Sequence, residues 1–247
     1  MKFLNQLNGG SARSRVAAVA ISLGLCAVAL SLMQRPALSQ EAAVAVPPPA
    51  IDEPSTGGPH TETAVLAGGC FWGVQGVFQH VRGVTNVVSG YSGGARDTAQ
   101  YETVSTGKTG HAESVQITYD ASQITYGRLL QIYFSVAHDP TEFNYQGPDH
   151  GTQYRSAIFP ANDMQKHIAQ SYIAQLDKSH VFEAPIVTRT DALKAFYPAE
   201  DYHQNYLTLH PDSMYIAIND MPKIENLRRL FPDLYRDKPV LVSTASK

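Results

Sequence analysis

"ETAVLAGGCFWGVQGVFQHV", from Glu62 to Val81, combines a strand pattern, a glycine turn and a helix pattern in one short stretch. Its first apolar run ends at Gly68 and Gly69, which allow a tight turn. Beyond the turn, apolar side chains recur at helical intervals, at Cys70, Val74, Val77, Phe78 and Val81. The stretch therefore predicts a strand that turns sharply into an amphipathic helix, with a cysteine where the helix begins.

The chain beyond this stretch continues to alternate strand and helix patterns as far as Tyr235. Helix patterns begin near Thr125 and after Asn162. Strand patterns occupy residues 84–91, 113–120, 154–159 and 184–190. Such alternation favours a sheet covered by helices, of the α/β or α+β class. We expect one domain over residues 63–235.

Three segments are expected to lie outside this domain. Residues 1–39 combine basic residues, a long apolar stretch and a small-residue cleavage pattern, which is typical of a secretory signal peptide; an uncleaved membrane anchor is the alternative. Residues 40–62 are rich in proline, glycine and small residues and predict a flexible tether. Residues 236–247 predict a loose tail. We therefore expect an exported protein, periplasmic or extracellular, or one anchored to a membrane and facing outward.

Charge and cysteine content narrow the classes of function. The leader holds four of the nineteen Lys and Arg residues and no acid, so the remainder carries fifteen basic against twenty-two acidic residues, a net charge near −7. Such an acidic chain is not expected to bind nucleic acid. The leader also holds Cys26, one of only two cysteines, so Cys70 has no partner for an internal disulfide. An unpaired thiol in an exported protein is either buried and inert or reactive by design.

The position of Cys70 favours the reactive alternative. The first N–H groups of a helix lack internal partners and create a positive potential. A thiol at that point is expected to have a lowered pKa and to be a good nucleophile. Phe71 and Trp72, beside Gly73, could form an apolar slot for a small alkyl or S-methyl group, or could simply be core residues.

Glu113 is a candidate general acid. It shares strand parity with Val115, Ile117 and Tyr119, so all four side chains are expected on one largely apolar face. A carboxyl group at the end of a buried face has a raised pKa, which suits proton donation near neutral pH. The alternative is that Glu113 lies beyond the end of the strand, in water.

Five motifs in order along the chain resemble one enzyme family. They are "GGCFWG" (68–73), "GYSGG" (90–94), "TGHAESV" (109–115), "GPDHGTQYRS" (147–156) and "YPAEDYHQNYL" (197–207). Together they resemble the peptide methionine sulfoxide reductases of the A type, which act on the S epimer of methionine sulfoxide. The resemblance covers residues 63–235 and implies an α+β fold, a ferredoxin-like α/β sandwich with a mixed sheet and flanking helices.

The resemblance also implies roles for individual residues in repairing proteins after oxidative damage. Cys70 would attack the sulfoxide sulfur, becoming a sulfenic acid. Glu113 would supply a proton to the sulfoxide oxygen, to which Tyr101 and Tyr154 would donate hydrogen bonds. The remaining matched positions would bind substrate: Phe71 and Trp72 around the S-methyl group, and Asp149 at the edge of the pocket. No bound cofactor or metal is implied.

The sequence departs from many of these relatives because it lacks further cysteines. Neither the loop before "TGHAE", which has Ser105, nor the tail after Phe231 contains one. The sulfenic acid of Cys70 therefore cannot be resolved within the chain. We expect an external thiol reductant: a thioredoxin-like protein, a glutaredoxin with glutathione, or dithiothreitol in vitro. Oxidised proteins carrying methionine sulfoxide would be the substrates, and free methionine sulfoxide is a further expected one. We expect a monomer.

Two other functions are compatible with the residue types alone. A cysteine hydrolase would pair Cys70 with a histidine, and the candidates are His80, His111, His138, His150 and His203. A non-enzymatic docking domain would use the aromatic pair and would keep its function after Cys70→Ser. The histidines show no metal-ligand spacing, so we expect no metal site; His111 is interpreted as a turn residue and His203 as structural.

Overall fold

The computed structural model describes residues 43–54, 58 and 60–243, and the predicted leader lies outside these residues. Within them, no helix is both long enough and apolar enough to cross a membrane. The strands are β1 (Thr61–Ala67), β2 (Val84–Ser92), β3 (Ala112–Asp120), β4 (Tyr145–Gln146), β5 (Asp149–His150), β6 (Ala157–Phe159), β7 (Arg189–Thr190) and β8 (Phe196–Pro198). The α-helices are α2 (Phe71–Gln79), α3 (Tyr101–Val104), α4 (Tyr126–Ile132), α5 (Asp163–Ser179), α6 (Tyr206–Leu209) and α7 (Met221–Leu230).

The remaining helical elements of the described residues are short turns. Three are 3₁₀ turns: η1 (Arg96–Thr98), η3 (Thr152–Tyr154) and η4 (Asp201–His203). Two are π-helical turns: η2 (Tyr133–Ala137), which continues α4, and η5 (Ile216–Asp220), which precedes α7.

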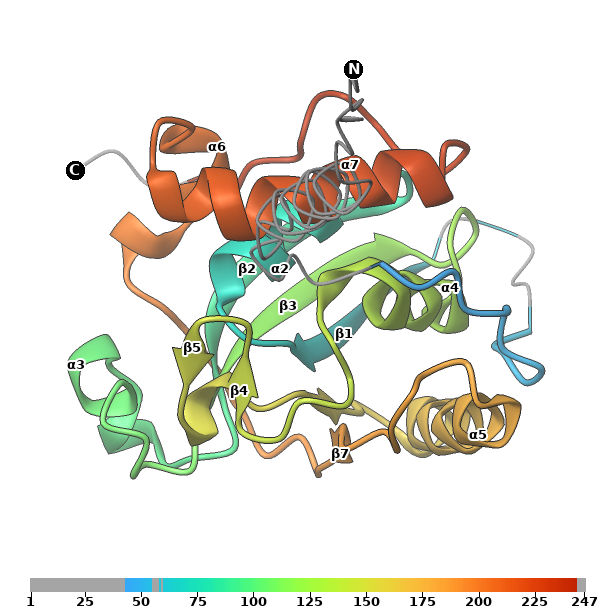
Figure 1. The fold of residues 1–247 in the computed structure, drawn as a ribbon, viewed down its shortest axis with the longest axis horizontal. Coiled ribbons are helices and arrows are strands. Elements are labelled where there is room, and N and C mark those ends of the chain that lie inside the picture. The colour runs from blue at the N-terminus through green and yellow to red at the C-terminus, as the bar shows by residue number, and fades with distance from the viewer. Residues whose placement is uncertain (1–42, 55–57, 59, 244–247) are drawn as a thin grey trace, which may run out of the picture. The chain divides into compact units, whose positions relative to one another are not determined.

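Six strands form one mixed sheet in the order β7-β6-β1-β3-β2-β8, and β4 and β5 form a separate hairpin (Figure 1). The strands β1, β2, β3 and β6, linked by α2 and α4, have the βαββαβ connectivity and the β6-β1-β3-β2 order of a ferredoxin-like fold. Every pair of neighbours among these four is antiparallel, whereas β7 runs parallel to β6. The predicted α+β class, with a mixed sheet and flanking helices, is confirmed.

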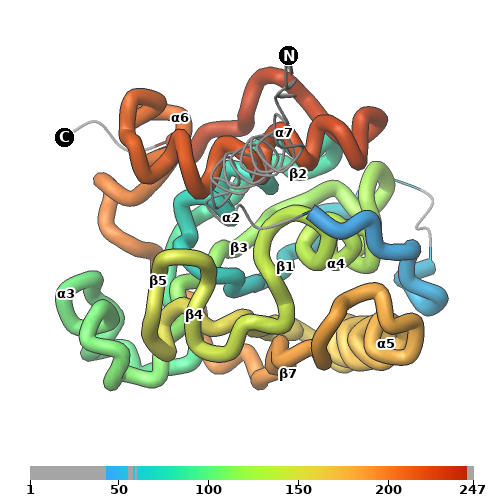
Figure 2. Tube along the Cα trace, viewed as in Figure 1, coloured from blue at the N-terminus to red at the C-terminus, as the bar shows by residue number. Residues whose placement is uncertain are grey.

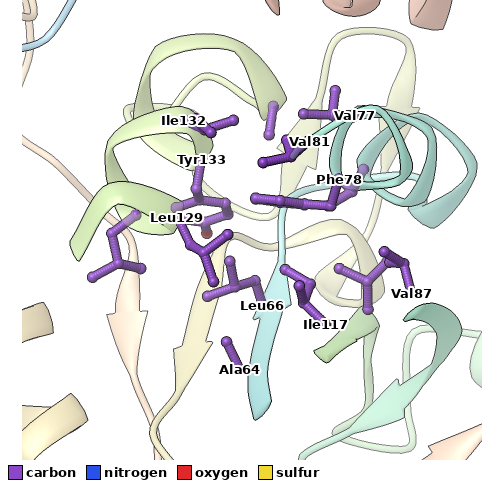
Figure 3. Packing of buried hydrophobic residues seen from close by; sticks show 14 of the residues in the cluster. Ala64, Leu66, Val77, Phe78, Val81, Val87, Ile117, Leu129, Ile132 and Tyr133 are labelled. Atoms are coloured by element: carbon purple, nitrogen blue, oxygen red, sulfur yellow. The ribbon is translucent and has the colours of Figure 1, made fainter. Parts of the chain in front are cut away.

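The main core lies between the sheet and the helices. Figure 3 shows Leu66 of β1 and Ile117 of β3 facing Phe78 of α2 and Leu129 of α4. Helix α7 packs against α2 and η2. The opposite face of the sheet carries a smaller cluster that includes Val65 and Phe159. The amphipathic pattern of the stretch from Glu62 to Val81 is thus satisfied by burial of its apolar side chains on the helix-covered face.

The segment before β1 differs from the expected flexible tether. Residues 43–54 lie along α4 and α5, as the blue trace shows in Figure 2. Val46 is buried, and Pro47 accepts a hydrogen bond from the Tyr172 hydroxyl. The Asp52 carboxylate accepts hydrogen bonds from the Thr125 hydroxyl and the backbone N–H of Gly127, at the start of α4. A proline-rich stretch adopts this extended path because side chains of the domain satisfy its carbonyl groups.

Two other expectations need correction, one for the C-terminal tail and one for the strand pattern that pairs with β6. The expected loose tail is held as far as Val242, because Val240 donates a backbone hydrogen bond to Gln79 and Val242 donates one to the Asn205 side chain. The strand pattern over residues 184–190 pairs with β6 only at its last two residues. Pro185 within that pattern has no N–H to donate to a ladder.

Candidate active site

The site forms where β1 turns into α2. Gly69 has a φ of +85°, and a side chain there would lie 2.6 Å from the Gln146 Cβ atom. Cys70 is the residue that precedes the first turn of α2, and its own side chain does not cap the helix. The predicted strand, turn and helix are confirmed, with the thiol at the helix start and 9% exposed.

Glu113 reaches the same point from strand β3. Its Oε2 atom accepts a 3.1 Å hydrogen bond from the backbone N–H of Phe71, the first residue of α2. Glu113 is 3% exposed, and Val115 and Ile117 on the same face are buried. The alternative position in water is therefore wrong. A side chain from the sheet satisfies an N–H group of the helix start that the helix itself leaves without a partner.

Burial makes Glu113 a weak acid. Its pKa is raised to about 8, chiefly by desolvation and to a smaller extent by the carboxylates of Asp149 and Asp220, against the opposing hydrogen bond from Phe71. Its carboxyl group is therefore mostly protonated at neutral pH. One oxygen accepts the Phe71 N–H, which leaves the protonated oxygen able to donate.

The expected lowering of the Cys70 pKa is wrong. Burial of the thiol raises its pKa well above the ordinary value, and negative charge on Glu113, Asp220 and Asp149 adds to this. The backbone N–H of Trp72 stabilises the thiolate but is the smaller effect. A helix start alone could not reveal this, because the opposing carboxylates come from distant parts of the chain.

Two phenols complete the polar side of the site. Tyr101 begins α3 and Tyr154 ends η3. Burial, together with the nearby Glu113 carboxyl and Cys70 thiol, raises the pKa of both hydroxyls, so both remain neutral hydrogen-bond donors. The backbone N–H of Tyr101 is held by the Glu200 carboxylate at 2.9 Å.

Asp149 lies in the β4–β5 hairpin and belongs to the same charged group. Its carboxylate accepts a short hydrogen bond from the Tyr215 hydroxyl. Its pKa is raised by burial, although that bond and the positive charge of Lys223 oppose the effect. The structure therefore brings together all seven residues predicted for the site: Cys70, Phe71, Trp72, Tyr101, Glu113, Asp149 and Tyr154.

Aromatic side chains form the apolar side of the site. Phe71 is buried, and its ring centroid lies 5.0 Å from that of His203. The Trp72 indole stacks on Tyr206 at 3.7 Å, and Tyr215 meets it edge-on at 5.8 Å. The Trp72 Nε1–H group donates a 3.1 Å hydrogen bond to His203 Nδ1. His203 is therefore not only a packing residue, because its hydrogen bond also orients the Trp72 indole.

Several residues that position the site were not singled out from the sequence. The buried Asp220 carboxylate lies against Gly73 in the first turn of α2, and Lys223 Nζ lies 3.8 Å from it. Gln204 and Asn205 hold α2 in place through its buried Gln75 and Gln79. Gln204 and Asn205 lie in the motif "YPAEDYHQNYL", but no local pattern indicates which element their side chains contact.

The geometry disfavours a cysteine hydrolase. His138 packs beside Gly68, yet its Nδ1 atom faces the Tyr133 carbonyl at 3.1 Å, and burial lowers its pKa to about 3. His111 instead bridges Gly94 and Ala95. Within residues 43–54, 58 and 60–243, no hydrogen bond joins Cys70 to an imidazole. Among the same residues, no cluster of three or more His, Cys, Asp or Glu residues could hold a metal ion.

Comparison with known proteins decides the family. The family model described as peptide methionine sulfoxide reductase matches residues 62–234. The chain belongs to the peptide methionine sulfoxide reductase family. It is an enzyme that reduces methionine sulfoxide in proteins, and so serves protein repair.

Individual members of the peptide methionine sulfoxide reductase family support this assignment. Peptide methionine sulfoxide reductase MsrA 2 of Mesorhizobium japonicum is 68% identical over 188 residues, 76% of this chain and 96% of that protein. MsrA 2 of Synechocystis is 50% identical over 190 residues, 76% of this chain and 89% of that protein. Among solved structures, reduced Mxr1 of Saccharomyces cerevisiae has a TM-score of 0.57 at 32% identity, covering 64% of this chain and 91% of its own. Methionine sulfoxide reductase A of Corynebacterium diphtheriae has a TM-score of 0.53 at 33% identity, covering 71% and 92%.

Proposed function

We propose that the Cys70 thiol reduces the S epimer of methionine sulfoxide, with Glu113 as the proton donor. The observation that carries this assignment is the hydrogen bond from the Phe71 N–H to Glu113. It fixes a mostly protonated carboxyl group beside the one cysteine of the domain. A sulfoxide sulfur becomes electrophilic when its oxygen is protonated or strongly hydrogen-bonded. A neutral carboxyl group can donate the proton or hydrogen bond that this activation needs.

The first half-reaction balances without an external proton. Glu113 donates its proton to the sulfoxide oxygen, and the sulfur of Cys70 attacks the activated centre. The thiol proton passes to the Glu113 carboxylate, and the oxygen ends on Cys70 as a sulfenic acid while methionine leaves. The raised pKa of both groups suits this exchange, because each is neutral before substrate binds.

The other site residues orient the substrate. Tyr101 and Tyr154 donate hydrogen bonds to the sulfoxide oxygen, and their neutral hydroxyls suit that role. Phe71 and Trp72 enclose the S-methyl group, and Asp149 holds the edge of the site together with the Tyr215 hydroxyl. One apolar wall and one hydrogen-bonding wall around the sulfur would accept only one of two mirror-image arrangements, which supports stereospecificity.

The second half-reaction uses an external thiol. Cys70 is the one cysteine of residues 40–247. A thiol RSH condenses with the sulfenic acid to give a mixed disulfide and water, and a second thiol releases Cys70 and RSSR. A thioredoxin-like protein, or a glutaredoxin with glutathione, is the proposed donor, and the proposed state of the enzyme is a monomer. Mass spectrometry of the oxidised enzyme after addition of each donor distinguishes these reductants.

Residues 40–247 with dithiothreitol and a peptide that contains both sulfoxide epimers test the reaction directly. Loss of the S epimer alone, followed by chiral separation and abolished by Cys70→Ser, is the expected result. Reduction that survives Cys70→Ser would overturn the assignment of the nucleophile.

Export through the segment 1–39 is a separate proposal, and N-terminal sequencing of the protein recovered outside the cytoplasm tests it.

A further inference from the structure

A cationic pocket is lined by residues from the loop after α3, from either side of the β4–β5 hairpin and from the β7–β8 connection. Its volume is about 570 Å³. Four basic residues line it: Lys108, Arg155, Arg189 and Lys194. Asp191 is the one acidic residue among the described lining residues, and it is already paired with Arg189 at 3.1 Å.

The charge of this pocket contrasts with the rest of the chain. The full chain has a formal net charge of −3. A local excess of basic side chains in a hollow focuses a positive potential that attracts anions. The guanidinium of Arg155 forms the buried part of the pocket and donates to the carbonyl groups of Gly110, His111 and Thr152. Those partners are neutral, and Asp191 is the acidic residue that acts on its charge.

The chain segments that line the pocket also carry residues of the active site. Gly110 precedes Glu113 by three residues, and Arg155 follows Tyr154. Phe143, 65% exposed, leads through Asn144 and β4 to Gln146, which packs against Gly69. The loop and the turn are joined, because the Thr152 hydroxyl donates a 2.6 Å hydrogen bond to the Gly107 carbonyl. The pocket and the active site therefore share the loop after α3, the segment around β4 and the residues that follow η3.

We propose that this pocket binds the carboxylate of an Asp or Glu residue that flanks the methionine sulfoxide in the substrate polypeptide. The exposed Lys108, Arg189 and Lys194 would pair with the carboxylate, and Arg155 would supply the fixed positive charge beneath them. Phe143 at the rim offers apolar surface to the neighbouring part of the substrate. This inference rests on the proposed function, because it assumes that substrates are reduced at Cys70.

Peptide kinetics test the inference. The substrates are peptides with one methionine sulfoxide and either Glu or Gln at each position from one to six residues away, on either side. At low ionic strength we expect Glu to improve kcat/KM roughly three- to tenfold over Gln at adjacent positions on one side only. Added salt should reduce the advantage, because the basic side chains are exposed.

Variants separate the pocket from general charge effects. Lys108→Gln with Lys194→Gln should abolish the preference for Glu, and Lys108→Glu with Lys194→Glu, which leaves two basic against three acidic residues, should reverse it in favour of peptides carrying Lys. The matched control, Lys178→Gln with Lys238→Gln, makes the same change of charge at exposed residues outside the pocket and should leave the preference intact. N-acetyl-methionine sulfoxide methylamide, which is neutral and too short to reach the pocket, should be reduced equally by all variants.

The outcomes distinguish the two proposals. Activity with no difference between Glu and Gln peptides would overturn the pocket assignment and leave the reaction at Cys70 standing. Equal loss of the preference in the control variant would also overturn it, since it would show a long-range effect of net charge. Failure to reduce any substrate, by a folded protein, would instead overturn the proposed function.

Discussion

The backbone N–H of Phe71 donates a 3.1 Å hydrogen bond to the Glu113 carboxyl group, and this contact joins the start of helix α2 to strand β3. The residue before Phe71 is Cys70, the proposed nucleophile, so the proposed proton donor is hydrogen-bonded to the backbone next to the attacking sulfur. Glu113 also faces Tyr91 across the β2–β3 ladder. The acid is therefore fixed by sheet register as well as by the helix, and its position does not depend on substrate.

Glu113→Gln should lower kcat roughly 10²- to 10⁴-fold, the usual contribution of a general acid. Glutamine keeps an oxygen for the Phe71 N–H but cannot release a proton to the sulfoxide. With a pKa of about 8, Glu113 is active in its protonated form, so the rate of the wild-type enzyme should fall as pH rises through about 8. Single-turnover reduction without added thiol, followed from pH 6 to 10, measures both effects. A variant with full activity, or a profile that still rises beyond pH 9, would show that another group donates the proton.

Cys70 should be slow to alkylate at neutral pH. Its thiol faces Glu113 from β3, Asp149 from β5, and Asp220 and Tyr215 from the η5 region, and burial with these negative charges raises its pKa. Asp220→Asn removes one charge and should move the rise in reaction rate with iodoacetamide to lower pH.

The matched control for this measurement is Glu225→Gln, an exposed carboxylate on the neighbouring helix α7. It should leave the alkylation profile unchanged. Rapid alkylation of the wild-type enzyme at pH 6 would contradict the raised pKa, whatever the variants do.

His203 should determine how Trp72 is held. His203→Ala removes the acceptor of the 3.1 Å bond from the indole, and one lost hydrogen bond of about 1 kcal/mol corresponds to a KM roughly fivefold higher. Because Trp72 is the sole tryptophan of the chain, its fluorescence reports the change without a label. An altered emission maximum together with a higher KM is expected. An unchanged spectrum would mean that stacking on Tyr206 alone fixes the ring.

Local patterns predicted the parts of the site that lie within single elements. The turn at Gly69 and the helix start at Cys70 follow from short-range spacing, which is why they could be predicted. The alternation of β3 placed Glu113 on the apolar face but left open whether its side chain is buried. The raised pKa of the thiol could not be predicted, because it depends first on burial and then on the charges of Glu113 and Asp220, which the folded chain brings to Cys70 from distant positions. The contact of Trp72 with His203 is likewise made only when the chain has folded.

The proline-rich segment before β1 shows the same limit in a different form. Its composition is typical of a tether, and nothing in the spacing of Asp52 and Glu53 indicates a partner. In the structure both carboxylates accept hydrogen bonds at the start of α4, whose first N–H groups have no partners within the helix. Composition reports whether a segment can form a core, but it does not report whether a core already formed by other residues will bind it.

Glu53 should make the stability of the protein depend on pH. Its pKa is raised to about 7, chiefly by burial and also by the nearby Glu62 carboxylate, against the opposing backbone N–H of Tyr126. A carboxyl group whose pKa is higher in the folded state favours folding while it is protonated. That contribution is fully present below the ordinary value near 4.5 and is lost as pH rises through about 7. Glu53→Gln, which keeps the acceptor for Tyr126, should therefore raise the midpoint of urea unfolding at pH 8 and change it less at pH 5.

Glu183→Gln, at an exposed position, is the matched control and should have no effect at either pH. A larger gain at pH 5 than at pH 8 would reverse the sign of the linkage and show that Glu53 is stabilised in its charged form.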